Sequence, residues 1–84
     1  MNVTVLTKPD CVQCDFTKTH FDKHGIEYDV VDITVDADAR QRAIDLGYFS
    51  APVVIVEADG QVAHWSGFKP DRIKALGAEA GEQQ

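Results

Sequence analysis

The chain has 84 residues and a formal net charge of −6, with 14 acidic residues against 8 Lys and Arg. This acidic balance argues against nucleic-acid binding, which depends on Lys and Arg at phosphates. The apolar content of 44% is ordinary for a globular domain, and no apolar run reaches the roughly 20 residues that a membrane-spanning helix needs. The opening MNVTVLTKPDC lacks a basic region followed by an apolar stretch, so we expect no secretory signal and a cytoplasmic location.

The first third of the chain is predicted to form a strand, a helix and a second strand. Residues 2–7 alternate apolar and polar side chains, which is typical of a strand. A helix is predicted over about residues 11–24, and Gly25 is a suitable end for it. One face of this helix carries Cys14, Thr17, Phe21 and His24. Residues 26–33 are predicted to be the second strand.

The rest of the chain adds a helix, a hairpin and a last helix. Asp36 is a suitable N-cap for a helix over about residues 37–46. Residues 53–56, Val-Val-Ile-Val, are typical of a strand buried on both faces. Asp59-Gly60 predicts a tight turn into a strand over residues 61–65. Pro70 is placed to begin the last helix, and residues 78–84 are expected to be a polar, disordered tail.

These elements predict an α/β fold in the order β-α-β-α-β-β-α. A strand–helix–strand opening requires a right-handed crossover between parallel strands, and a hairpin adds antiparallel ones. We therefore expect a single domain over residues 1–77, with a four-stranded mixed sheet and helices on both faces.

The acidic residues gather between residues 27 and 38, where no Lys or Arg occurs. We interpret this stretch as a solvated acidic face. A surface that steers a basic partner is the alternative.

Cys11 and Cys14, the two cysteines of the chain, stand where the first strand meets the first helix. The first amides of a helix have no intrahelical partners and carry partial positive charge, which lowers the pKa of a thiol in a Cys-X-X-Cys pair to about 3.5–7.5. Lys8 favours the thiolate as well, whereas Asp10 and Asp15 oppose it. A disulfide across so short a loop stabilises a fold by only about 2 kcal/mol. The pair therefore indicates a redox site of thioredoxin-like type.

A zinc site is the alternative use of these cysteines, because Cys11, Cys14, His20 and His24 are acceptable zinc ligands. A continuous helix would place Cys14 and His24 about 15 Å apart along its axis. Zinc–ligand bonds measure only about 2.0–2.3 Å, so one ion could not bind both residues. We interpret the histidines as packing residues instead.

The two thiols are assigned different roles in thiol–disulfide exchange. Cys11, at the more exposed first position, is expected to attack a disulfide of the partner. Cys14, one turn further and more covered, is expected to resolve the resulting mixed disulfide. No bound cofactor is needed, because the two thiols carry the two electrons.

The cysteine pair followed by Ala51-Pro52 before a buried strand resembles the thioredoxin superfamily. The length and element order resemble a glutaredoxin, and the motifs CVQC and WSGFKPD are similar to those of NrdH-redoxins. The resemblance implies a thioredoxin-like fold and a cis Pro52 that keeps metal away from the thiols. It also implies that the backbone of Ala51 pairs with a partner peptide. Lys69 stands where the family commonly has arginine, which keeps the charge but loses bidentate hydrogen bonding.

The resemblance implies an electron donor to the large subunit of a class Ib ribonucleotide reductase, reduced by thioredoxin reductase and NADPH. Phe68 should crowd the cleft in which glutathione would bind, although a glutathione-dependent glutaredoxin remains the alternative. A monomer is expected, since the protein must dock with two partners in turn. Trp65 could be a core residue, but the family match favours a loop-fixing role for Trp65, Ser66 and Phe68 at the partner surface. The residues expected at the partner surface are Lys8, Val12, Gln13, Ala51, Pro52, Trp65, Ser66, Gly67, Phe68 and Lys69.

Overall fold

The computed structural model describes the backbone of residues 1–82 and the side chains of residues 1–78. Its elements follow the predicted order and are β1 (Asn2–Thr7), α1 (Val12–Lys23), β2 (Asp29–Asp32), α2 (Ala37–Asp45), β3 (Val53–Ala58), β4 (Gln61–Ser66) and α3 (Pro70–Glu82). Within the part of the chain that the structure describes, no helix is long and apolar enough to span a bilayer.

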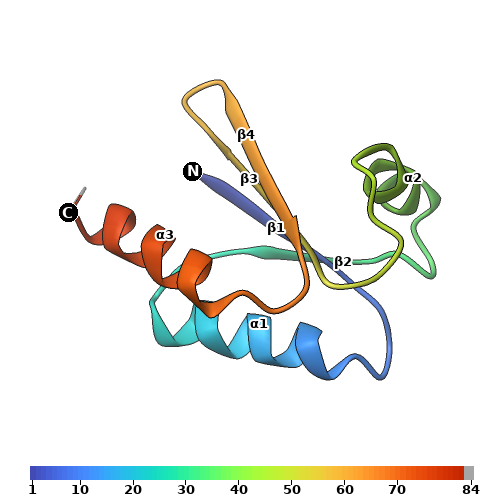
Figure 1. Cartoon of the computed structure of the whole chain (residues 1–84), viewed down its shortest axis with the longest axis horizontal. Helices are drawn as coiled ribbons and strands as arrows, with labels where there is room; N and C mark the ends of the chain where they lie inside the picture. Colours follow the sequence, from blue (N-terminus) through green and yellow to red (C-terminus); the bar gives the residue numbers. More distant parts are fainter. Residues whose placement is uncertain (83–84) are drawn as a thin grey trace.

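The strands form one mixed sheet in the order β2-β1-β3-β4. β1 and β2 run parallel, whereas β3 is antiparallel to both β1 and β4. Helices α1 and α3 lie on one face of the sheet, and α2 lies on the other (Figure 1). The predicted four-stranded mixed sheet with helices on both faces is therefore confirmed.

The side chains of β3 point alternately to the two faces of the sheet, so they contribute to two separate core clusters. Val54 and Val56 face α1 and α3, and Val53 and Ile55 face α2. Because both faces are covered, every residue of this β-branched run is buried, as predicted. The cluster under α1 and α3 also contains Val3, Val5, Phe21, Ile26, Trp65 and Ile73.

The end of α1 explains why β2 is shorter than the predicted residues 26–33. Gly25 has a φ of +68°, and its N–H donates to the Asp22 carbonyl at 3.1 Å. The N–H of Ile26 donates to the carbonyl of Phe21 at 3.0 Å. These two bonds form a Schellman motif, so the backbone of Ile26 completes the helix end instead of joining the sheet.

The hairpin turn agrees with its sequence signal, but the end of α3 does not. Asp59 and Gly60 have φ values of +54° and +76°, which are the two positive values of a type I′ turn. The tail predicted from residue 78 is wrong as far as Glu82, because α3 continues through Gly77. Gly77 lies against His24 and keeps a helical backbone, and alanine and glutamate in this stretch favour helix. Residues 83–84 lie outside the described part.

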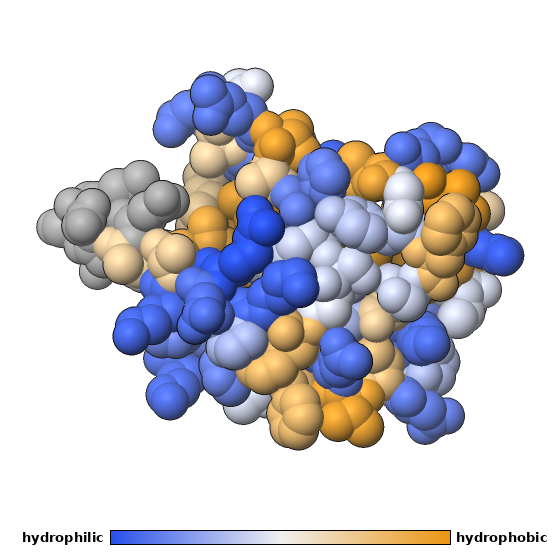
Figure 2. Space-filling view, in the orientation of Figure 1, coloured by the Kyte–Doolittle hydropathy of each residue, from blue (hydrophilic) through white to orange (hydrophobic). Residues whose placement is uncertain are grey.

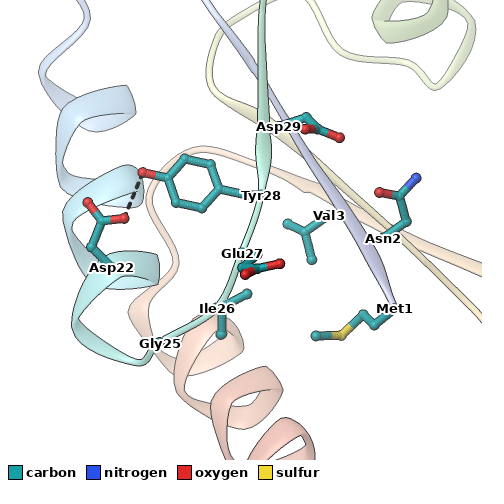
Figure 3. A pocket seen from close by; sticks show the side chains of 9 residues that line it. All are labelled: Met1, Asn2, Val3, Asp22, Gly25, Ile26, Glu27, Tyr28 and Asp29. Atoms are coloured by element: carbon teal, nitrogen blue, oxygen red, sulfur yellow. Dashed lines mark hydrogen bonds between the residues drawn. The ribbon is translucent and has the colours of Figure 1, made fainter.

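Several residues of the acidic stretch have local structural roles. Asp32 accepts hydrogen bonds from the Thr34 hydroxyl at 2.6 Å and the Thr34 amide at 2.8 Å, and these bonds lower the pKa of Asp32. Asp36 caps α2 by accepting from the Ala39 amide at 2.9 Å, as predicted. Figure 3 shows a hollow beside Glu27 and Asp29, at the end of β1 opposite to the cysteines.

Candidate active site

Cys11 and Cys14 form a disulfide at the junction of β1 and α1, with their Cα atoms 5.2 Å apart. Cys11 is the N-cap of α1, a position where a side-chain oxygen usually accepts a hydrogen bond from a free amide. Here the Sγ atom of Cys11 accepts from the Cys14 N–H at 3.1 Å. A Cys11 thiolate at this position would be stabilised by a hydrogen bond from the same amide and by the positive end of the helix dipole.

The two cysteine residues differ in exposure in the predicted direction, although both are largely covered. Cys11 is 8% exposed and Cys14 is 1% exposed. Cys11 is therefore less open than the sequence position suggested, because the cap geometry folds its sulfur toward the helix. The roles of nucleophile for Cys11 and resolving thiol for Cys14 stay predictions, and the order of these exposures agrees with them.

The charged neighbours of the disulfide lie in solvent. Lys8 is exposed in the loop between β1 and α1, and Asp10 follows it with a φ of +57°. Asp15 forms an ion pair with Lys18 at 3.6 Å, which offsets its negative charge beside the thiols. The helix end and the Cys14 amide are therefore the main local stabilisers of a thiolate.

The strand register brings two further loops to the disulfide end of the sheet. Leu6 pairs with Val53, and Val53 pairs with Ser66, so the end of β1, the start of β3 and the end of β4 lie together (Figure 1). The Ala51–Pro52 bond is cis, and Pro52 is buried. The Pro52 carbonyl accepts from the Gly67 N–H at 2.9 Å.

Gln13 joins the cysteine motif to the loop after β4. Its Oε1 accepts a hydrogen bond from the Phe68 N–H at 3.0 Å. A Cβ atom on Gly67 would lie 3.3 Å from the same oxygen, and Gly67 has a φ of +85°. Gln13 was expected to contact a partner, and its bond to Phe68 was not predicted, because no local pattern predicts a contact across 55 residues.

Phe68 packs on an exposed stripe of α1. Its ring lies 5.6 Å from the ring of Phe16 and 4.8 Å from that of His20. Phe16 is 50% exposed and Val12, one turn earlier, is 63% exposed. Figure 2 shows apolar side chains along the lower edge of the molecule, where α1 lies in Figure 1. Phe16 was not predicted as a site residue, although its four-residue spacing from Val12 places both side chains on the same face of α1.

Trp65 is buried rather than exposed at the surface, and the loop-fixing role expected for it stays a prediction. It is 3% exposed and belongs to the core cluster beneath α1 and α3. The guanidinium carbon of Arg72 lies 4.8 Å from the centre of its ring. Its neighbours stay closer to the surface: Ser66 donates to the Ser50 carbonyl at 3.2 Å, and Lys69 is exposed.

The predicted separation of the cysteines from the histidines holds, because α1 is continuous from Val12 to Lys23. His20 contacts the ring of Phe68, and His24 lies against Gly77. Among the residues with described positions, no three His, Cys, Asp or Glu side chains gather in a way that could hold a metal ion. The contacts of His20 and His24 agree with the packing role expected for them.

A disulfide at the first turn of α1, beside a cis proline on a thioredoxin-like fold, defines a thiol–disulfide oxidoreductase. A sequence model described as Glutaredoxin matches residues 3–62. The glutaredoxin-like protein NrdH of Salmonella typhimurium is 36% identical over 76 residues, covering 90% of this chain and 89% of the relative. The chain belongs to the glutaredoxin family and, within it, to the NrdH-type glutaredoxin-like proteins.

Solved structures agree with this assignment. The NrdH-redoxin of Escherichia coli superposes with a TM-score of 0.80 at 33% identity, covering 90% of this chain and 95% of that one. The thioredoxin-like protein BC3987 gives a TM-score of 0.75 at 32% identity, covering 89% of this chain and 99% of that one.

Proposed function

We propose that this protein donates electrons to the large subunit of a class Ib ribonucleotide reductase and is reduced by thioredoxin reductase with NADPH. The observation that carries the proposal is the Cys11–Cys14 disulfide capped by the Cys14 amide, in a chain of NrdH type. The Escherichia coli relative is described as glutaredoxin-like with a thioredoxin-like activity profile, which favours a thioredoxin system as the source of electrons.

The exchange proceeds from the reduced protein. The Cys11 thiolate attacks one sulfur of the client disulfide, forming a mixed disulfide while the other client sulfur leaves as a thiolate and takes up a proton. Cys14 loses its proton and attacks the Sγ atom of Cys11. The Cys11–Cys14 bond forms, and the second client sulfur leaves. The second client sulfur takes up a proton equivalent to the one that Cys14 released, and the first takes its proton from solvent. Two electrons have passed to the client, with no bound cofactor, and the dithiol of the reductase reverses the sequence.

The loop after β4 supports a choice against glutathione. Phe68 fills the space beside α1 with an aromatic ring held by Phe16 and His20. The net charge of −6 also disfavours an anionic tripeptide. We propose in addition that Ala51, half-buried next to Pro52, offers its backbone to an extended client segment.

A cytoplasmic monomer fits this role best. Dithiols stay reduced in the cytoplasm, where NADPH-linked reductases maintain them. The surface around Cys11 has to meet the reductase and the client in turn, and a monomer leaves it free for both.

The test is an NADPH-consumption assay in which purified ribonucleotide reductase is the final acceptor. One series contains thioredoxin reductase, and a parallel series contains glutathione with glutathione reductase. Rapid turnover in the first series, absent with Cys11→Ser, is expected. Turnover in the glutathione series alone would replace the proposal with a glutathione-dependent glutaredoxin.

A further inference from the structure

The hydrogen bond between Gln13 and Phe68 links the redox motif to the loop over residues 66–68. The acceptor is a side-chain oxygen from between the two cysteines, and the donor is a backbone N–H that no helix or strand uses. The 3.3 Å separation from a Cβ on Gly67 means that only glycine lets the loop approach Gln13 without displacing its side chain.

Both sides of this contact are held in place. The carbonyl of Gln13 accepts from the hydroxyl of Thr17 at 2.8 Å, and Thr17 is fully buried. On the other side, the Gly67 N–H bonds to Pro52 and the Ser66 hydroxyl bonds to Ser50. The loop is therefore tied to the segment before β3 by two bonds and to α1 by the carboxamide of Gln13.

We propose that Gln13 is a specificity-determining positioning residue, whose carboxamide fixes the backbone of the Gly67–Phe68 segment beside Cys11 for docking of the reductase. The inference rests on the proposed function, since it names a determinant of partner docking at the same site. Gln13 acts through the loop and takes no part in the exchange of sulfur bonds.

Because this contact is exposed, its loss should affect binding of the reductase without unpacking the core of the protein. Gln13 and the hydrogen bond are solvent-exposed, whereas the ring of Phe68 is held by Phe16 and His20. Loss of the carboxamide acceptor would therefore free the loop backbone without unpacking the core. A freed loop must be ordered again when the reductase docks, and that ordering weakens binding. The chemical step at Cys11 would be unaffected.

The experiment uses Gln13→Met, which keeps the length of the side chain and removes the acceptor. Net hydrogen-bond energies correspond to about two- to tenfold changes in an equilibrium, so the exchange rate of the Phe68 amide with solvent should rise by about that factor. The Gly67 amide, bonded to Pro52, serves as an internal reference and should not change. Gln13→Glu retains an oxygen acceptor and should restore slow exchange at Phe68.

The same variants are assayed with thioredoxin reductase. Gln13→Met should raise KM for the redoxin about two- to tenfold and leave kcat unchanged. Gln41→Met is the matched control, because Gln41 is an exposed glutamine on α2 that bonds to Asp45 on the other face of the sheet. It should leave both constants at their wild-type values.

The possible failures are distinct. A Gln13→Met protein with wild-type Phe68 exchange, or with faster exchange but wild-type KM, would overturn the role given to Gln13 alone. A wild-type protein that thioredoxin reductase fails to reduce would overturn the proposed function, whatever the amide exchange shows.

Discussion

The Cys14 N–H lies 3.1 Å from the Sγ atom of Cys11 and donates a hydrogen bond to it across the first turn of α1. In the disulfide this contact caps the helix. In the dithiol we expect the same amide to face a sulfur that can carry a full negative charge, and hydrogen bonds to charged acceptors are the stronger ones. Helix capping and thiol activation are thus one interaction.

The Cys11 thiol is accordingly predicted to have a pKa well below that of a free cysteine. The test variant is Cys14→Ser, which leaves a single thiol and keeps the amide. The rate of iodoacetamide alkylation as a function of pH gives the pKa directly. A value equal to that of a free cysteine would mean that the helix end does not activate the site.

Gly67→Ala is predicted to destabilise the protein more than Gly47→Ala. Both glycines have positive φ, of +85° and +92°, so alanine costs roughly 1–2 kcal/mol of backbone strain at either position. A Cβ on Gly47 meets nothing within 4 Å, whereas on Gly67 it meets Gln13. The Gln13 side chain must shift by a few tenths of an ångström to admit this Cβ, which strains its hydrogen bond to Phe68 and adds up to about 1 kcal/mol to the loss in the Gly67 variant. Urea denaturation measures both, and equal losses would contradict the contact.

Trp65→Phe is predicted to lower stability by about 1–3 kcal/mol and to leave KM for the reductase unchanged. The indole belongs to the core and carries the guanidinium of Arg72 on its face, so its loss is a packing loss. Arg72→Gln should cost less, about 0.5–1 kcal/mol. Thermal denaturation followed by circular dichroism measures both. A raised KM with unchanged stability would restore Trp65 as a docking residue.

Phe68→Gly is predicted to increase any activity coupled to glutathione. Removal of the ring that packs on Phe16 and His20 opens the space beside α1 and frees the loop. The measurement is NADPH consumption with glutathione and glutathione reductase, compared between wild type and variant. No gain would show that another feature excludes the tripeptide.

Tyr28 provides a test of local electrostatics away from the active site. Burial, the hydrogen bond to Asp22 at 3.0 Å and the charge of Asp22 raise the pKa of the Tyr28 phenol. Figure 3 shows the phenol directed at the Asp22 carboxylate. Asp22→Asn should lower this pKa only partly, because burial is the largest cause and remains. Ultraviolet titration in a Tyr48→Phe background isolates the signal.

The same shift gives a pH dependence of stability. The folded state holds the Tyr28 proton more tightly than the unfolded chain, so this contribution is fully present below the unfolded pKa. It is lost as pH rises through the raised folded value. Tyr28→Phe should therefore remove a component of the alkaline loss of stability, measured by urea denaturation at a series of alkaline pH values. An unchanged alkaline profile would contradict it.

The order of the elements was predictable because each signal acts over a few residues. Asp36 caps the helix that follows it, Asp59 and Gly60 form the turn between their own strands, and Pro70 begins α3. The end of α3 was predicted wrongly at Gly77. A glycine ends a helix only if its φ becomes positive, and the close approach of His24 accompanies a helical Gly77 instead.

In the candidate site, too, the features set by neighbouring residues were predictable and the long-range contacts were not. Cys11 and Cys14 could be placed from the chain alone, since the start of a helix is a local feature and its free amides belong to the same turn as the sulfurs. The burial of Trp65, the packing of Phe68 against Phe16 and the bond from Phe68 to Gln13 depend on the pairing of strands that are distant in sequence. Such contacts depend on where the register of β1, β3 and β4 places three separate loops, and no periodicity within any one segment encodes that distance.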